Sequence, residues 1–581
     1  MKNNFFLVFL ALLLFMPEAF CQHKLLILDM VHNNPGEPLT VTSFRDPNKI
    51  AEYGYNGMVI NEFRPVSCAV TYDSLNRNIF PKGSESRKWV DSMTIVIRHQ
   101  IDSCHKAGLK IFYFTDIIVV PKRLKELYHD QICDSNGLIS FEKPMTEKIH
   151  RIMLDEIFER FPGLDGLVIR TGETYLQNVP YHTGNGPIPR DESSWAHNKT
   201  LLTDGGEDIH IKLINLLRDE VCVKYKKILI YRTWDFGFFH TQPQYYLNVT
   251  NRIKPHPNLY FAIKHTQGDY HRTIKFNPTL GIGNHKQIVE VECQREYEGK
   301  GAFPDYVING LINGFEEYSN DKSPKSLKEL KSNKNFAGIW SWSRGGGWVG
   351  PYIKNELWCD LNAYVVSHWA ADTTQSEEKI FNGYATNVLG LKGKNVVKFR
   401  KLCLLSADAV IRGHESLLFP VDPWWTRDEF LGGLNELKST FDTIIAQHLV
   451  KEALQEKELC VNQWKQIFNL AGSIECPDPK TKNYIMVSSE YGLILHSIVE
   501  KGWTILLKGR VGDISGKYDK TGIRKAIRAY DNLWLKFEDL SKREKQCATL
   551  YKPYSFNNIS PTYHGVDGMK YWVDHYRSLV K

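Results

Sequence analysis

Eight short apolar runs constrain the fold of this chain more than any other feature of its sequence. They occupy residues 25–29, 57–61, 109–115, 164–170, 227–232, 259–264, 287–293 and 336–342. Runs of this length and composition are typical of buried parallel strands. Helix-like segments lie between them, as in residues 88–108, where apolar residues recur every three or four positions and Gly108 can end the helix. Eight strand-then-helix units predict a closed (β/α)8 TIM barrel, with an open doubly wound sheet as the alternative.

The pattern changes after residue 350. Residues 396–414, 429–471 and 491–511 are long segments with helical periodicity and few strand signals. A chain of 581 residues also exceeds the usual size of a single domain. We therefore predict a barrel over residues 22–350, followed by an α-helical C-terminal domain over residues 351–581.

The first 21 residues have the pattern of a signal peptide. A short basic start, MKNN, precedes the apolar stretch FFLVFLALLLFM, and Ala19, Phe20 and Cys21 follow at the expected cleavage site. Export with a mature chain beginning at Gln22 is the prediction. A lipid anchor on Cys21 is the alternative, which Phe20 disfavours. No later stretch is apolar and long enough to cross a bilayer, so we expect a soluble, periplasmic or secreted protein.

Composition and motifs exclude several classes of function. The formal net charge is +7, without a long block of lysine and arginine, which argues against a nucleic-acid partner. The ten cysteines after the predicted cleavage site form no CxxC pair, which argues against a zinc site and against a disulfide framework. No HExxH, GxSxG or dinucleotide motif occurs. We therefore predict neither metal nor cofactor, and the oligomeric state stays open.

Charged and aromatic residues follow the predicted strands, at the end where a barrel of this kind holds its functional residues. In chain order they are Asn61, Glu62, Thr115, Asp116, Arg170, Glu173, Arg232, Asp235, Lys264, Asp269, residues 290–296 and residues 342–348. Glu173, Asp269 and Glu296 stand out, because like charges in one cleft repel each other unless function or counter-charges retain them. These three acids predict a hydrolytic site.

Two segments resemble the signature of the family 67 glycoside hydrolases, the α-glucuronidases. They are KHTQGDY at residues 264–270 and EVECQREYEG at residues 290–299, in which Glu290, Glu296 and Tyr297 keep the family's spacing. DGLVIRTGETY resembles the segment that carries the family's acid, and IYRTWDF resembles the strand end with its substrate-binding arginine, here Arg232. The first predicted strand follows the signal peptide closely, so we expect the family's N-terminal β-domain to be missing.

The resemblance implies an inverting glycosidase that removes an α-linked uronic acid from plant polysaccharide fragments. Glu173 would be the general acid, and Asp269 with Glu296 would activate a water molecule. The substrate-binding residues are expected to be Arg170, Arg232, Lys264, Glu290, Tyr297, Trp234 and Trp342.

Alternatives remain at several of these positions. Arg170, Arg232 and Lys264 would either bind the uronate carboxylate or neutralise the three acids. Trp234 and Trp342 would either stack on a sugar face or belong to the core, and His182 and His265 would act as pocket or loop residues. The alternatives for the whole chain are a glycosidase of the same fold acting on another terminal sugar and a catalytically inactive glycan-binding protein.

Overall fold

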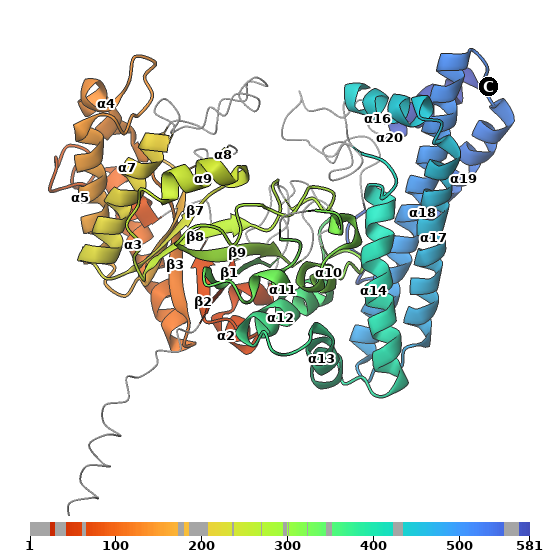
Figure 1. The fold of residues 1–581 in the computed structure, drawn as a ribbon, viewed down its shortest axis with the longest axis horizontal. Coiled ribbons are helices and arrows are strands. Elements are labelled where there is room, and N and C mark those ends of the chain that lie inside the picture. Colours follow the sequence, from red (N-terminus) through yellow and green to blue (C-terminus); the bar gives the residue numbers. More distant parts are fainter. Residues whose placement is uncertain are drawn as a thin grey trace, which may run out of the picture.

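The eight predicted strands form a closed parallel barrel, shown in Figure 1. The structure is a computed structural model, and it describes residues 24–29, 42–60, 66–171, 179–184, 207–234, 238–268, 270–293, 299, 301–321, 324–343, 351–421, 434–550 and 569–581. The predicted signal peptide lies outside these residues. The closed order β1-β10-β9-β8-β7-β5-β3-β2 confirms the barrel and excludes the open sheet.

The observed strands begin and end within two residues of the predicted runs. Their bounds are β1 Leu25–Asp29, β2 Gly57–Ile60, β3 Lys110–Asp116, β5 Gly166–Arg170, β7 Ile228–Arg232, β8 Leu259–Lys264, β9 Lys286–Glu292 and β10 Phe336–Trp342. Each strand pairs with its neighbours in parallel register, for example Phe114 with Val168 and Ile263 with Val289. A small antiparallel sheet, which the sequence did not predict, pairs β4 Val119–Pro121 with β6 His182–Gly184.

Helices surround the barrel on its outer face. Those within the barrel part of the chain are α2 Pro47–Glu52, α3 Glu85–Lys106, α4 Lys122–Ile132, α5 Pro144–Arg160, α7 Glu207–Leu217, α8 Phe238–Thr241, α9 Pro243–Thr250, α10 Ile308–Asn313 and α11 Leu327–Leu330. Short 3-10 or π turns η1 Ser43–Arg45, η2 Val66–Ala69, η4 Arg218–Lys224 and η5 Glu316–Tyr318 complete the connections. Amphipathic faces drive this packing: the buried residues of α3, Val90, Ile97 and Ile101, recur at helical spacing.

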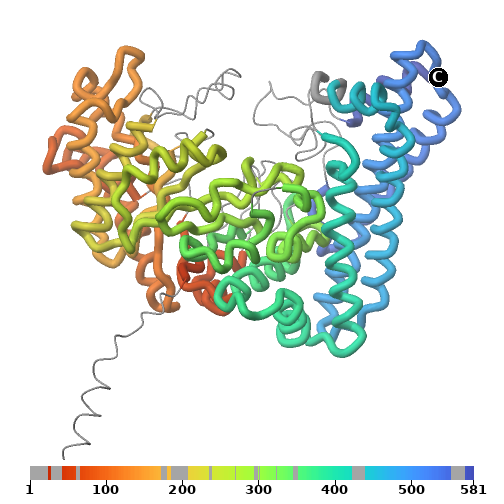
Figure 2. Tube along the Cα trace, in the orientation of Figure 1, coloured from red at the N-terminus to blue at the C-terminus, as the bar shows by residue number. Residues whose placement is uncertain are grey.

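A second group of helices follows the barrel, and its long helices form a bundle at the barrel's side (Figures 1 and 2). These helices are α12 Leu357–Ala371, α13 Glu377–Gly383, α14 Lys394–His414, α16 Leu434–Ala446, α17 Val450–Ser473, α18 Pro479–Ser515, α19 Lys520–Arg543 and α20 Met569–Leu579, with η6 Tyr384–Val388 after α13. The colours of Figure 2 show the chain running from the barrel (orange to green) into the bundle (teal to blue). Among the described residues, no helix is both long and apolar enough to cross a membrane.

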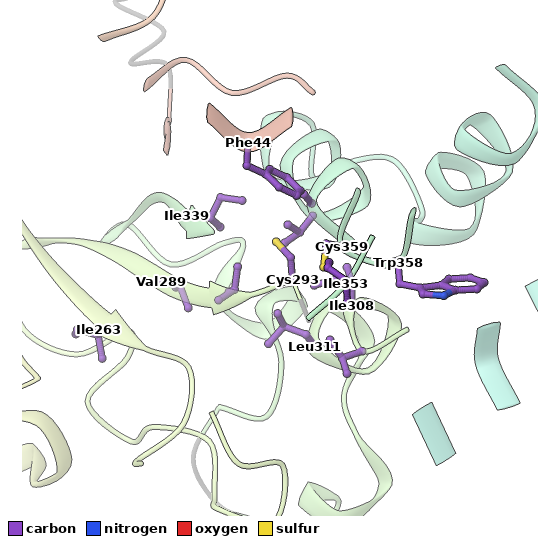
Figure 3. Close-up of a cluster of buried hydrophobic side chains, with 14 of the residues drawn as sticks. Phe44, Ile263, Val289, Cys293, Ile308, Leu311, Ile339, Ile353, Trp358 and Cys359 are labelled. Atoms are coloured by element: carbon purple, nitrogen blue, oxygen red, sulfur yellow. The ribbon is translucent and has the colours of Figure 1, made fainter. Parts of the chain in front are cut away.

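The barrel and the bundle share one hydrophobic core. Figure 3 shows part of it, where Ile263, Val289 and Ile339 from the outer faces of β8, β9 and β10 gather with side chains from α10 and α12. Trp358 of α12 continues this core into the bundle. Its indole stacks on Phe399 of α14 at 6.0 Å, and its Nε1 donates to Ser488 Oγ of α18 at 3.2 Å. Nine of the ten described cysteines are buried, as is typical of this small hydrophobic side chain.

Candidate active site

A layer of charged residues lies at the carboxyl end of the barrel, directly above its apolar interior. The interior is filled by a separate cluster that includes Phe114, Val168, Ile230, Ala262, Ile288 and Trp340. Because side chains alternate along a strand, the residue two positions further on each strand faces the same way. These residues are Asp116, Arg170, Arg232, Lys264, Glu290 and Trp342. Five of the six carry charge, so the layer marks the change from core to polar site.

Asp116 and Arg170 form one ion pair in this layer. The ends of β3 and β5 place the two residues opposite each other in register. Arg170 Nε donates to one oxygen of Asp116 at 2.6 Å and Arg170 Nη2 to the other at 2.7 Å. The guanidinium carbon also lies 5.2 Å from the ring centroid of Phe114. Because both side chains are buried, this bidentate contact fixes their orientation.

Arg232 and Glu290 form a second bidentate pair. Arg232 Nε lies 2.9 Å from Glu290 Oε1, and Arg232 Nη2 lies 3.0 Å from Oε2. The hydroxyl of Tyr270 donates to the same carboxylate, at 3.1 Å from Oε2. Glu290 is fully buried. A buried carboxylate with three donors is a fixed part of the site's floor.

Aromatic rings enclose the remaining cation, Lys264. Its Nζ lies 3.9 Å from the ring centroid of Trp234 and 4.6 Å from that of Tyr270. Both distances are in the range of cation–π attraction. The guanidinium carbon of Arg232 likewise lies 5.1 Å from the ring centroid of Trp342. Of these two tryptophans Trp234 is buried, whereas Trp342 is only partly buried.

The structure thus brings together six of the residues predicted for the site: Arg170, Arg232, Lys264, Glu290, Trp234 and Trp342. The structure also pairs Arg170 with Asp116 and Arg232 with Glu290, and neither pair was predicted. The sequence places Asp116 at the rim without a role, and it assigns no role to Tyr270. Strand alternation was the available signal for Asp116, because it lies two positions after the inward Phe114. No local signal marks the contact of Tyr270 with Glu290.

The three predicted catalytic acids, Glu173, Asp269 and Glu296, lie outside the described residues, as does Tyr297. The strands that precede them are described. Glu173 follows β5, Asp269 follows β8 and Glu296 follows β9, and all three strands run in parallel. Their carboxyl ends carry Arg170, Lys264 and Glu290 of the charged layer. Convergence of the three acids stays a prediction.

The residues before and after Asp269 belong to one closed loop. Thr266 and Phe276 form an isolated antiparallel bridge that closes the loop after β8. Within it, the backbone N–H of Tyr270 donates to Thr266 Oγ1 at 3.1 Å, and Tyr270 has a positive φ of 62°. A non-glycine residue in this conformation is uncommon, and such residues cluster at functional sites. The Tyr270 side chain, which reaches Glu290, therefore joins this loop to the charged layer.

His182 is a core residue of the small antiparallel sheet. Its Nδ1 bonds the carbonyl oxygen of Pro180 at 2.8 Å, and its ring packs on Phe80 and Trp89, each 5.8 Å away. Burial lowers the pKa of this imidazole to about 4, so it is neutral at physiological pH. His265 is likewise buried, with its Nδ1 3.3 Å from the carbonyl oxygen of Glu290. Within the part of the chain that is described, no group of His, Cys, Asp and Glu has a geometry that could hold a metal ion.

Comparisons with known proteins support the fold. No protein-family model and no curated protein match the chain, so the resemblance to family 67 stays a hypothesis. One similar solved structure is a GH138 enzyme targeting pectin rhamnogalacturonan II, with a TM-score of 0.57 and 12% identity, covering 96% of this chain and 67% of that one. CpGH84D has a TM-score of 0.38 and 10% identity, and the match covers 96% of this chain and 75% of that one. A mutant of the O-GlcNAc hydrolase of Thermobaculum terrenum has a TM-score of 0.39 and 9% identity, and the match covers 96% of this chain and 94% of that one. At 12% identity, the likeness to the GH138 enzyme establishes the barrel fold alone.

Proposed function

We propose that this chain is an exported glycoside hydrolase that removes a terminal uronic acid from polysaccharide fragments. The observation that carries the proposal is the buried charged and aromatic layer at the carboxyl ends of the barrel strands, from which the segments with Glu173, Asp269 and Glu296 depart. Active sites of this fold lie at that end of the barrel. The similar GH138 enzyme targets a pectin, which supports a polysaccharide substrate.

The proposed mechanism follows from the bond to be broken. Cleavage of a glycosidic bond needs a proton on the leaving oxygen and a nucleophile at the anomeric carbon, so one carboxyl must be neutral and another ionised. Glu173 would donate the proton. Asp269 and Glu296 would deprotonate a water molecule on the opposite face of the sugar, which inverts the configuration. Inversion needs a separation of about 6.5 to 9.5 Å between the acid and the base.

The floor of the site suits a sugar. Trp342 is only partly buried, and an aromatic ring in a site can pack against the apolar face of a sugar. Lys264 supports the uronic acid, because an ammonium held against two aromatic rings can attract a substrate carboxylate as a point charge. Lys264 is therefore the residue that we expect to contribute most to recognition of the acidic group.

One observation favours a neutral terminal sugar as the second candidate. Arg170 and Arg232 already bind Asp116 and Glu290 in bidentate fashion, so these two pairs carry no net charge toward a ligand. A substrate carboxylate would have to share the guanidinium groups with these buried acids. The two pairs would then act as a neutral hydrogen-bonding floor, which a hexose could use equally well.

A product assay by NMR on defined oligosaccharides with terminal uronic or neutral sugars separates the two candidates. We expect release of a uronic acid with inverted anomeric configuration. Release of only a neutral sugar would favour the second candidate, and no release from any substrate would favour a glycan-binding protein.

Glu173→Gln tests the catalytic assignment. We expect kcat to fall by about 10²- to 10⁴-fold with KM nearly unchanged, because the variant loses its proton donor. A substrate with an activated leaving group should restore part of the rate, since it needs no protonation. Glu85→Gln, at an exposed position on α3, is the matched control and should keep wild-type kinetics. Unchanged activity of Glu173→Gln would refute the assignment.

A further inference from the structure

The loop after β8 is attached to the helical bundle immediately beyond Asp269. Arg272 Nη1 donates to the carbonyl oxygen of Ala407 in α14 at 2.6 Å. The same guanidinium pairs with Glu317 through Nε and Nη2, and its carbon lies 4.3 Å from the ring centroid of Phe315. Arg272 is buried, so these contacts are shielded from water. Three positions separate this anchor from Asp269.

The part of α14 that receives this loop is itself held by α17. His271 Nδ1 lies 3.9 Å from a carboxylate oxygen of Glu415, the residue after α14, and both side chains are buried. Lys457 of α17 donates to the carbonyl oxygen of Glu415, and Glu456 accepts from the backbone N–H of Leu417 at 2.9 Å. Buried charges that bind backbone groups in this way make the end of α14 a rigid support.

The loop after β9, which carries Glu296, is attached to the same region of the bundle. The ring of Phe303 is fully buried among aromatic side chains of three helices. Its centroid lies 5.6 Å from Trp464 in α17, 5.3 Å from His496 and 6.3 Å from Tyr491 in α18, and 6.4 Å from His414 in α14. Edge-to-face and offset arrangements at these distances are the favourable ones.

Two glycines allow this loop to approach the bundle closely. Gly299 has a φ of +86°, and a Cβ there would lie 2.3 Å from the ring of Phe303. Gly301 has a φ of +90°, and a Cβ there would lie 2.9 Å from Cys359 Sγ of α12. The carbonyl oxygen of Gly301 also accepts from the hydroxyl of Tyr484 in α18 at 2.7 Å. Gly299 and Gly301, three and five positions after Glu296, therefore lie close against these side chains.

We propose that the helical bundle holds the loops of Asp269 and Glu296 at their working separation, with Arg272 and Phe303 as positioning residues. This inference rests on the proposed function. The two proposed bases lie on different loops, and both loops end on one rigid surface formed by α14, α17 and α18. Two carboxylates can activate a single water molecule only if both lie at the correct distance from it. A displacement of a reacting group by about 1 Å can lower the rate about 100-fold. The bundle is thus part of the catalytic apparatus without touching the substrate.

Three variants test the proposal against one control. Phe303→Leu shortens the anchor of the β9 loop, Arg272→Lys removes the bidentate contact of the β8 loop, and Tyr484→Phe removes only the hydroxyl that binds Gly301. Phe158→Leu replaces a buried phenylalanine of α5 that packs on Tyr225, away from both loops. On a uronoside with an activated leaving group, we expect each positioning variant to lower kcat about tenfold or more with KM changed less than about threefold. Phe158→Leu should leave both constants unchanged.

Double variants separate positioning from simple destabilisation. If Phe303 acts through Glu296, adding Phe303→Leu to Glu296→Gln should lower kcat no further, because the group being positioned is already gone. An equal additional loss in the double variant would overturn the inference. The inference would also be overturned if Tyr484→Phe and Arg272→Lys had the same kinetics as Phe158→Leu. This test does not depend on whether Phe303→Leu folds. Wild-type kcat in Glu296→Gln and Asp269→Asn would instead refute the proposed function itself.

Discussion

Asp116 and Glu290 determine what the charged layer of the barrel can do. Each carboxylate is buried and bound by a guanidinium through two hydrogen bonds. A charge in this position is stable only with its partner, because the protein interior solvates it poorly. The pairs therefore behave as single units, and removal of one member takes the bidentate partner away from the buried charge of the other.

Asp116→Asn should lower the free energy of unfolding by about 3–5 kcal/mol, because it leaves Arg170 without its carboxylate in the barrel interior. Urea titration at pH 7 measures this loss. Glu85→Gln is the control, since Glu85 forms a surface pair with Lys88 and its side chain is 79% exposed. Exposed pairs contribute about 0–1 kcal/mol. Equal midpoints for the two variants would contradict the importance that we give to the buried pair.

Asp360 in α12 predicts a pH dependence of stability. Burial, followed by the nearby carboxylate of Glu356, raises the pKa of this side chain to about 7. The unfolded chain has a carboxyl pKa of about 3.9, so the folded protein favours the protonated form. The contribution of protonated Asp360 to the free energy of unfolding is therefore fully present below about pH 4 and is lost as the pH rises through about 7. The loss amounts to about 4 kcal/mol at most.

Asp360→Asn should flatten this dependence, because the amide stays neutral at every pH. Unfolding free energies at pH 5, 6, 7 and 8 provide the measurement. We expect the variant to gain stability over the wild type as the pH rises, with the largest difference at pH 8. Parallel stability curves for the two proteins would show that Asp360 does not titrate in this range.

The residues of the site were partly predictable from the sequence. Arg170, Arg232 and Lys264 were found because they end apolar runs, and Glu290 was found because its spacing to Glu296 matches the family signature that the sequence resembles. The pairing of Arg170 with Asp116 and of Arg232 with Glu290 was not predicted, because Asp116 lies 54 positions from Arg170 and Glu290 lies 58 positions from Arg232. Such contacts depend on which strands become neighbours and in what register, and no local pattern encodes that information.

At the scale of elements, the sequence predicted all eight barrel strands because apolar runs with abrupt polar ends are distinctive. It did not predict β6, whose His182, Thr183 and Gly184 have no apolar pattern and depend on pairing with β4. Residues 429–471 were predicted as one helical segment. The structure divides the described part into α16 and α17, with His448 at a positive φ of 59° between them. Helical periodicity continues across this break, so it conceals the turn.

Close packing of α17 on α18 gives a prediction for a pair of helices. A Cβ at Gly492 would lie 2.2 Å from the ring of Trp464, so Gly492→Ala should lower the free energy of unfolding by roughly 1–3 kcal/mol through overpacking. Gly472→Ala in α17 is the matched control, because its nearest neighbour would be Met486 Sδ at 3.9 Å. This control should be neutral or more stable by up to about 1 kcal/mol, since alanine favours helix. Thermal and urea unfolding of both variants provide the comparison.

At the scale of the whole molecule, the barrel and the bundle form one structural unit. Their shared core runs from the outer face of β8, β9 and β10 through α12 to α14 and α18, with Trp358 at its centre. The loops after β8 and β9 add polar and aromatic contacts to the same helices. Elements that bury one another's apolar surface lose stability together when either part opens.

This organisation predicts that damage to the bundle spreads to the barrel. Gly492→Ala lies in α18, yet it should speed hydrogen exchange in the β3 segment Lys110–Asp116 as much as in α17 Val450–Ser473, under denaturant conditions where global opening dominates exchange. β3 is a stringent reporter, because it lies on the side of the barrel away from β8, β9 and β10. Faster exchange in α17 with unchanged exchange in β3 would mean that the two parts unfold separately. The bundle would then be an accessory to a barrel that is stable by itself, rather than the support on which its loops depend.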